Sequence, residues 1–131
     1  MAGLGDLLQS ADWKSEKHIP VIEAPDKVNK GEFFKVTVGV GKGIPHPNKT
    51  EHFISWISVF FQPQGDKYPY QVAKAEFSAH GASINGPDTS AVYAHPEMAV
   101  TFKTDKPGMI FASSYCNIHG LWQASRELAL A

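Results

Sequence analysis

Short apolar runs separated by turn residues constrain the fold of this chain more than any other feature of its sequence. Phe34, Val36, Val38 and Val40 alternate with more polar neighbours, which is the period-2 pattern of a half-buried β-strand. The run at residues 53–61 is apolar on both faces, as expected for a central strand. Further strands are expected at residues 70–77, 91–93, 98–103 and 109–115.

Glycine, proline, asparagine and aspartate gather between these runs and predict turns. The clusters lie at residues 41–43, 62–66, 85–88 and 104–108, and such residues interrupt regular structure for reasons of backbone geometry. Strands broken by turns at roughly ten-residue spacing favour an all-β sandwich or barrel of Greek-key type.

The N-terminal residues show a different period. Leu4, Leu7, Leu8 and Ala11 recur at helical spacing, so a short N-terminal helix up to about Asp12 is expected. The chain has 131 residues and shows no internal repeat or linker. We therefore expect a single domain over residues 1–131.

Composition and charge exclude several classes of function. A hydrophobic fraction of 43% and a charged fraction of 19% are those of a soluble globular protein. The net charge of −1 argues against a nucleic-acid binder that works through bulk positive charge. No apolar run approaches the roughly 18 residues needed to cross a bilayer, and residues 1–10 lack the pattern of a secretory signal. A cytoplasmic protein without nucleic-acid or membrane partners is expected.

One cysteine, Cys116, accompanies six histidines. A single thiol excludes an intrachain disulfide and any Cys-rich zinc or iron–sulfur site. Cys116 and His119 are three residues apart, a spacing at which thiolate and imidazole can bind one metal across a tight loop. A buried thiol beside a histidine is also common in ordinary packing, so the pair needs support from elsewhere in the chain.

Three more histidines lie in predicted loops. His46 stands between Pro45 and Pro47, which bias the backbone there toward an extended conformation. Loops at one end of a sandwich converge in space. We therefore predict a shared metal site, while His80 and His95 are interpreted as ordinary loop or surface histidines. The predicted ligands are His18, His46, His52, Cys116 and His119.

The number and softness of these ligands bear on the metal. Four imidazoles and a thiolate are too many for tetrahedral zinc, although three imidazoles and a thiolate would suit it. Blue-copper sites use two histidines, one cysteine and usually an axial methionine, but no methionine follows His119 and Met109 falls in a predicted strand. Iron fits best. A cupredoxin-type electron carrier and a β-sandwich binding module with structural zinc remain alternatives.

Three segments of the chain resemble the signatures of superoxide reductases. They are Glu-Lys-His-Ile-Pro at 16–20, His-Pro-Asn-Lys-Thr-Glu-His at 46–52 and Ser-Tyr-Cys-Asn-Ile-His-Gly-Leu-Trp at 114–122. Their order, with Gly-x-x-x-Asn-Gly-Pro at 81–87 between them, is similar to the one-iron, neelaredoxin-like form of the family. Two-iron relatives carry an additional Cys-rich centre, which the single cysteine excludes.

The resemblance implies a fold, a reaction and roles for individual residues. The implied fold is an immunoglobulin-like antiparallel β-sandwich, often assembled as a homotetramer. The implied reaction is one-electron reduction of superoxide to hydrogen peroxide at one iron per chain, re-reduced by a donor such as rubredoxin. The implied equatorial ligands are His18, His46, His52 and His119, with axial Cys116.

The resemblance also assigns two residues beside the metal. Glu16 matches the carboxylate that can occupy the sixth position of the ferric iron, and Lys17 matches the lysine beside the open position. Lysines in the same loops predict a locally positive surface that would steer an anion, although lysines are also common in solvated loops. Those lysines are Lys14, Lys17, Lys42 and Lys49. Trp122 is expected to pack beneath the loop that joins Cys116 to His119.

Overall fold

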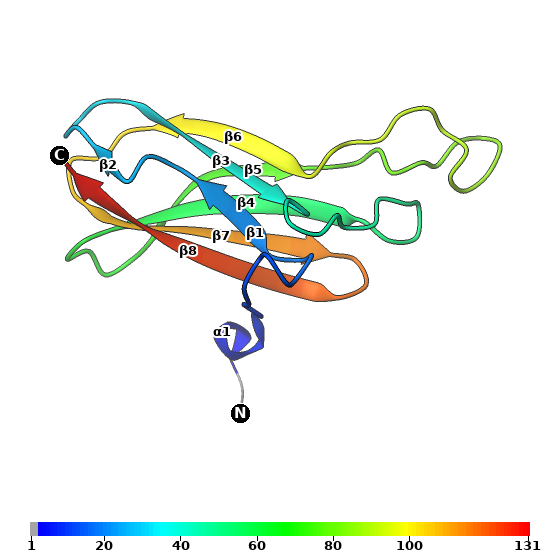
Figure 1. The fold of residues 1–131 in the computed structure, drawn as a ribbon, viewed down its shortest axis with the longest axis horizontal. Coiled ribbons are helices and arrows are strands. Elements are labelled where there is room, and N and C mark those ends of the chain that lie inside the picture. The colour runs from blue at the N-terminus through cyan, green and yellow to red at the C-terminus, as the bar shows by residue number, and fades with distance from the viewer. Residues whose placement is uncertain (1–2) are drawn as a thin grey trace.

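Two β-sheets face each other in the computed structural model, which describes residues 3–131 (Figure 1). One sheet has three strands in the order β1-β3-β6, and the other has five in the order β2-β8-β7-β4-β5. The elements are α1 (Leu4–Leu7), β1 (Pro20–Glu23), β2 (Lys27–Val28), β3 (Phe34–Val40), β4 (Ile54–Pro63), β5 (Tyr70–Glu76), β6 (Glu97–Phe102), β7 (Gly108–Cys116) and β8 (Gly120–Leu130). The predicted all-β sandwich is confirmed.

The core lies between the two sheets and follows from the alternation seen in the sequence. Val36 and Val38 of β3 are completely buried, as are Ile57 and Val59 of β4 and Ile110 of β7. Every second side chain of a strand faces the same way, so these residues meet across the interior. All strand pairings are antiparallel except that of β2 with β8.

Most predicted strands agree with the structure to within a few residues, but the one at 91–93 is wrong. There, Tyr93 makes only an isolated bridge to His80. Val92 and Tyr93 are 64% and 43% exposed, so this segment presents no apolar face to a core. It belongs instead to the β5–β6 loop, residues 77–96, which extends far beyond the end of the sandwich (Figure 1).

The predicted N-terminal helix is present but shorter than expected. It consists of the single turn α1 and does not reach Asp12. Beyond it the backbone attaches to β8: the Gln9 amide donates to the Leu121 carbonyl at 3.2 Å, and the Gln9 carbonyl accepts from Gln123 at 2.9 Å. A short helix has few internal hydrogen bonds. Backbone pairing with β8 therefore takes the place of a second helical turn at Gln9.

The C-terminal residues form the longest strand. β8 spans Gly120–Leu130, and its residues from Gly120 to Leu128 pair with β7. Within residues 3–131 no helix is both long and apolar enough to pass through a membrane.

Candidate metal centre

A tight hairpin between β7 and β8 brings the only thiol against an imidazole. Cys116 ends β7 and is completely buried, and it pairs in register with Gly120, the first residue of β8. Gly120 has a φ of 81°, a conformation that favours glycine. The turn places His119 Nδ1 at 3.8 Å and the His119 backbone nitrogen at 3.4 Å from Cys116 Sγ.

His18 reaches the same place from the other end of the chain. It stands two residues before β1 and is only 5% exposed. Its Nε2 lies 3.1 Å from His119 Nδ1. Two nitrogens at about 2.1 Å from a common metal and at right angles to each other would be about 3.0 Å apart, so this separation suits two adjacent ligands.

Trp122 packs beneath this pair, as predicted. The indole is 8% exposed and stacks on the His18 ring. Its Nε1 donates to the His119 carbonyl at 3.2 Å. One side chain of β8 therefore fixes both histidines.

The β3–β4 loop, residues 41–53, supplies the other two imidazoles. The His46 ring lies 4.9 Å from that of His18 and 4.8 Å from that of His52, and His52 lies 5.1 Å from His119. With His18 and His119 at 4.7 Å, the four rings form a closed cycle. Ligating atoms of His18, His52, Cys116 and His119 all lie within 4.8 Å of one another.

Two ring nitrogens in this cycle are buried and have no hydrogen-bond partner among residues 3–131. They are His46 Nε2 and His52 Nε2. The His46 Nδ1–H donates to the Pro47 carbonyl at 2.6 Å, so its Nε2 carries the lone pair. An unsatisfied buried polar atom is unfavourable, and metal coordination would satisfy both. The structure thus offers Nε2 of three histidines, Nδ1 of the fourth and one thiol sulfur.

Burial favours the neutral form of His18, His46 and His52, which is the form that binds metal. It lowers the pKa of His46 to about 4. It also lowers the pKa of His18 and that of His52.

Glu16 contacts the cycle from outside. Its Oε1 accepts hydrogen bonds from the His18 backbone nitrogen at 3.1 Å and from His18 Nδ1 at 2.6 Å. The bond from the His18 side chain is the main reason that the pKa of Glu16 is lowered. A carboxylate that holds the far nitrogen of a ligating histidine fixes its tautomer and orientation. Here Glu16 acts on His18, and its role as a sixth ligand stays a prediction.

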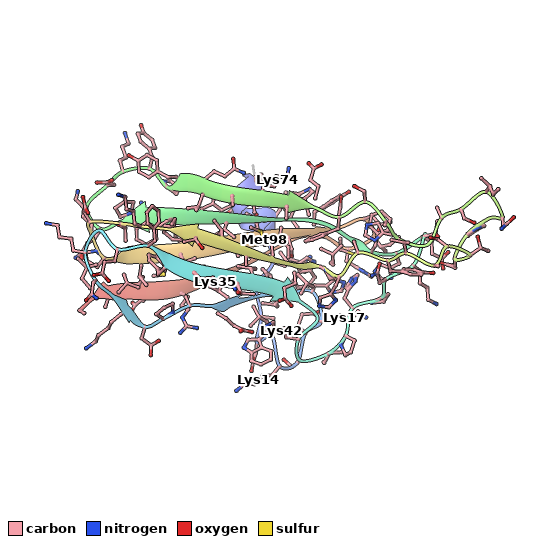
Figure 2. All side chains as sticks on the ribbon, turned by 90° about the horizontal axis from the view of Figure 1, so that it is seen from above. Lys14, Lys17, Lys35, Lys42, Lys74 and Met98 are labelled. Atoms are coloured by element: carbon pink, nitrogen blue, oxygen red, sulfur yellow. The ribbon has the colours of Figure 1, made fainter. Side chains whose placement is uncertain are left out.

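The predicted positive surface is smaller than the lysine count suggested. Lys42 is paired with Glu23, and the Lys14 ammonium lies over the Trp13 ring and points away from the body (Figure 2). Lys17 is half-buried at the end of the sandwich that carries the loops (Figure 2). Among residues 3–131 no carboxylate oxygen lies within 4.0 Å of its ammonium.

The two remaining histidines differ from each other. The His95 side chain is 75% exposed, near Glu97, as predicted. His80 lies in the β5–β6 loop, as predicted, but it is not at the surface, since it is only 8% exposed. Its ring nitrogens lie within hydrogen-bond distance of Asn48 Oδ1 and of the Phe77 carbonyl oxygen, and its face stacks on Phe53.

Asn117 was not singled out as a structural link by the sequence pattern, although it lies inside the Cys-x-x-His segment. Its Oδ1 accepts from the Phe53 amide at 2.8 Å, and its Nδ2 donates to the Glu51 carbonyl at 2.9 Å. It therefore joins the Cys116 turn to the segment around His52.

Comparison with known proteins agrees with this geometry. The family model described as desulfoferrodoxin matches residues 10–125. Neelaredoxin from Megalodesulfovibrio gigas is 50% identical, covering 95% of this chain and 96% of that protein. Superoxide reductase from Pyrococcus furiosus is 52% identical, covering 92% and 94%.

A solved structure gives the same result for the fold. The reduced form of superoxide reductase (neelaredoxin) from Archaeoglobus fulgidus superposes with a TM-score of 0.88 at 56% identity, covering 95% of this chain and 99% of that one. Residues 10–125, which the family model matches, include all the loops that carry the imidazole cycle. The chain therefore belongs to the desulfoferrodoxin family, close to the proteins named superoxide reductase and neelaredoxin.

Proposed function

We propose that this chain is a superoxide reductase, which converts superoxide to hydrogen peroxide without releasing oxygen. The observation that carries the proposal is the cycle of four imidazoles beside a buried thiol, in which two ring nitrogens are buried and unpartnered among the described residues. The relatives named superoxide reductase support the same activity.

The donor set fits one iron ion per chain. The residues that would hold it are His18, His46, His52 and His119 through nitrogen and Cys116 through sulfur. Five donors exceed the four of structural zinc, and a cupredoxin-type copper site would leave two of the four imidazoles without a role. When bound, the iron supplies the single electron that superoxide gains.

The chain's own residues would bring superoxide in and provide its surroundings. Superoxide is a small anion, so an unpaired cation beside the site raises its local concentration. Lys17 fits this role because it adjoins His18 and lacks a carboxylate partner among residues 3–131. Superoxide takes up one electron and two protons to become hydrogen peroxide. Glu16 would serve as a carboxylate able to move between His18 and the open position.

We further propose a rubredoxin-like electron donor, a homotetrameric assembly, one domain over residues 1–131 and a cytoplasmic location. The exposed side of His119, next to Ile118 at 58% exposure, supports electron entry there, since an exposed ligand gives a short path from an external donor. The tetramer and the rubredoxin-like donor rest on the resemblance to one-iron superoxide reductases.

A combined metal and kinetic experiment tests the function. The purified protein is reduced, its iron, copper and zinc are quantified, and it is mixed with a pulse of superoxide while peroxide and oxygen are followed. We expect iron, peroxide and no oxygen. Release of oxygen would identify a dismutase instead. A copper-loaded protein with a strong visible band and no consumption of superoxide would favour the electron carrier, and a colourless zinc protein would favour the binding module.

A further inference from the structure

His80 is a buried, hydrogen-bonded histidine that the proposed chemistry does not use. Its Nε2 lies 2.5 Å from the Phe77 carbonyl oxygen, and its Nδ1 lies 3.0 Å from Asn48 Oδ1. Its ring stacks on Phe53 with centroids 3.9 Å apart and planes inclined by 11°. Both ring nitrogens therefore lie within hydrogen-bond distance of an oxygen, and one face of the ring packs against Phe53.

The segment from His46 to His52 delivers two predicted ligands, and the contacts of His80 fall within it and directly after it. Asn48 comes two residues after His46, and Phe53 directly follows His52. The Asn48 amide is held a second time, because its Nδ2 donates to the Ala94 carbonyl at 2.8 Å. His80 therefore contacts the β3–β4 loop at its middle and at its end.

The same two loops are joined again between those points. The Thr50 amide donates to Asp88 Oδ1 at 2.8 Å, and the Asp88 amide donates to Thr50 Oγ1 at 3.0 Å. Thr50 Oγ1 in turn donates to the His80 carbonyl at 3.2 Å. The β3–β4 loop is thus attached to the β5–β6 loop at three of the six residues from Asn48 to Phe53.

The backbone beside His80 is itself fixed. Gly81 has a φ of 99°, and a Cβ at this position would lie 2.7 Å from the Tyr93 hydroxyl oxygen. The Gly81 carbonyl accepts from the amides of Thr89 and Ser90, at 2.9 Å and 3.0 Å. Because the backbone next to it is fixed, the His80 side chain can restrict the motion of the β3–β4 loop.

We propose that His80 is a positioning residue for the metal, which holds His46 and His52 at the separation that coordination requires. The inference rests on the proposed metal site and does not depend on which substrate that site reduces. Two buried, unpartnered nitrogens would relax apart in a loop that was free to move, since separation would let water reach them. Partners that orient ligands from outside typically change metal affinity 10- to 100-fold when removed.

The test uses two variants that break the contact between His80 and Asn48. The control variant lies in the β5–β6 loop, as His80 does. His80→Phe keeps an aromatic ring against Phe53 but removes both ring nitrogens. Asn48→Ala removes the other partner and leaves the His80 ring in place. His95→Phe makes the same chemical change at an exposed position. For each, ferrous-iron affinity is measured by competition with a chelator, and amide hydrogen exchange of residues 48–53 is measured in the metal-free protein.

We expect iron affinity to fall about 10- to 100-fold in His80→Phe and Asn48→Ala, with faster exchange at residues 48–53. The double variant should lose less than the sum of the two single losses, because both changes remove the shared contact between His80 and Asn48. His95→Phe should match the parent. Unchanged affinity in a folded His80→Phe, or additive losses in the double variant, would overturn the proposal.

If His80→Phe does not fold, Asn48→Ala alone decides, and unchanged affinity and exchange in that variant would also overturn it. The exchange measurement uses metal-free protein. It therefore answers the question even if the parent shows no superoxide reductase activity, an outcome that would count against the proposed function instead.

Discussion

The indole of Trp122 stacks on the imidazole of His18, with ring centroids 4.7 Å apart and planes inclined by 10°. The same indole donates to the carbonyl of His119. One residue of β8 thereby orients two predicted ligands that are 101 residues apart in the sequence.

Replacing Trp122 by alanine should lower the free energy of unfolding of the metal-free protein by about 3–5 kcal/mol, because a large buried ring is lost. Trp122→Phe keeps a ring against His18 and should lose clearly less. Urea denaturation of both variants measures the difference. Equal losses would show that the stacked ring itself contributes nothing.

Replacing Asn117 by alanine should weaken the connection between the Cys116 turn and the segment around His52, because two side-chain hydrogen bonds are lost and the backbone bond from the Asn117 amide to the Phe53 carbonyl remains. The Phe53 amide would lose its acceptor, and an unsatisfied buried donor costs about 1–3 kcal/mol. Ile118→Ala, at the neighbouring position that is 58% exposed, is the control and should stay within about 0.5 kcal/mol of the parent. Denaturation curves that do not distinguish the two variants would contradict the role of Asn117.

Replacing Lys17 by alanine should slow the association with superoxide and weaken its dependence on ionic strength, because a local attraction that salt screens is removed. Lys42→Ala is the matched control, since Lys42 is already neutralised by Glu23. Stopped-flow rates over a salt series measure both. A Lys17→Ala variant with the parent's salt dependence would exclude steering by this residue.

Replacing Cys116 by serine should abolish the thiolate-to-iron absorption band and greatly slow superoxide reduction. A hydroxyl stays protonated where a thiol ionises, so the electron density that a thiolate donates to iron would be missing. Absorption spectra, iron content and stopped-flow rates are measured together. A variant that retains iron and reduces superoxide at the parent's rate would show that the thiolate is dispensable.

The metal-free protein should become less stable as the pH falls from 6.5 to about 4, the ordinary and the lowered pKa of His46. Within that window the unfolded chain binds a proton at this residue that the folded chain does not, so protonation favours unfolding. The lowered pKa values of His18 and His52 act in the same direction.

Urea denaturation of metal-free protein across this window tests the prediction. His46→Gln removes one of the titrating groups and should flatten the dependence without abolishing it. Stability that is constant down to about pH 4 would mean that the buried imidazoles accept protons as readily in the folded state as in the unfolded one.

The sandwich could be predicted from sequence because its core strands are short apolar runs between turn residues, alternating in β3 and apolar on both faces in β4. β3 was predicted to the residue, since Val36 and Val38 face the interior between more exposed neighbours. β8 could not be predicted because the residues from Gly120 to Leu130 do not alternate cleanly in burial. Their strand conformation comes from pairing with β7, which is a long-range effect.

The histidine cycle could be predicted because its ligand types are rare and stand in loops beside turn residues. The contacts that support it could not. His80 binds Asn48 across 32 residues, and nothing in the local pattern around either residue indicates the pairing. The sequence pattern includes Lys42 in a positive surface and does not indicate its ion pair with Glu23. That pair forms only when β1 and β3 lie side by side.

The hairpin turn that carries Cys116 and His119 has a consequence for how the protein matures. It lies between the last two strands, whereas His18 precedes the first. During synthesis the ribosome releases His18, His46 and His52 long before the thiol and the fourth imidazole are available. The complete site forms only when β8 has emerged and paired with β7. A chain without β7 and β8 would present three of the predicted ligand histidines without the thiol and the fourth imidazole.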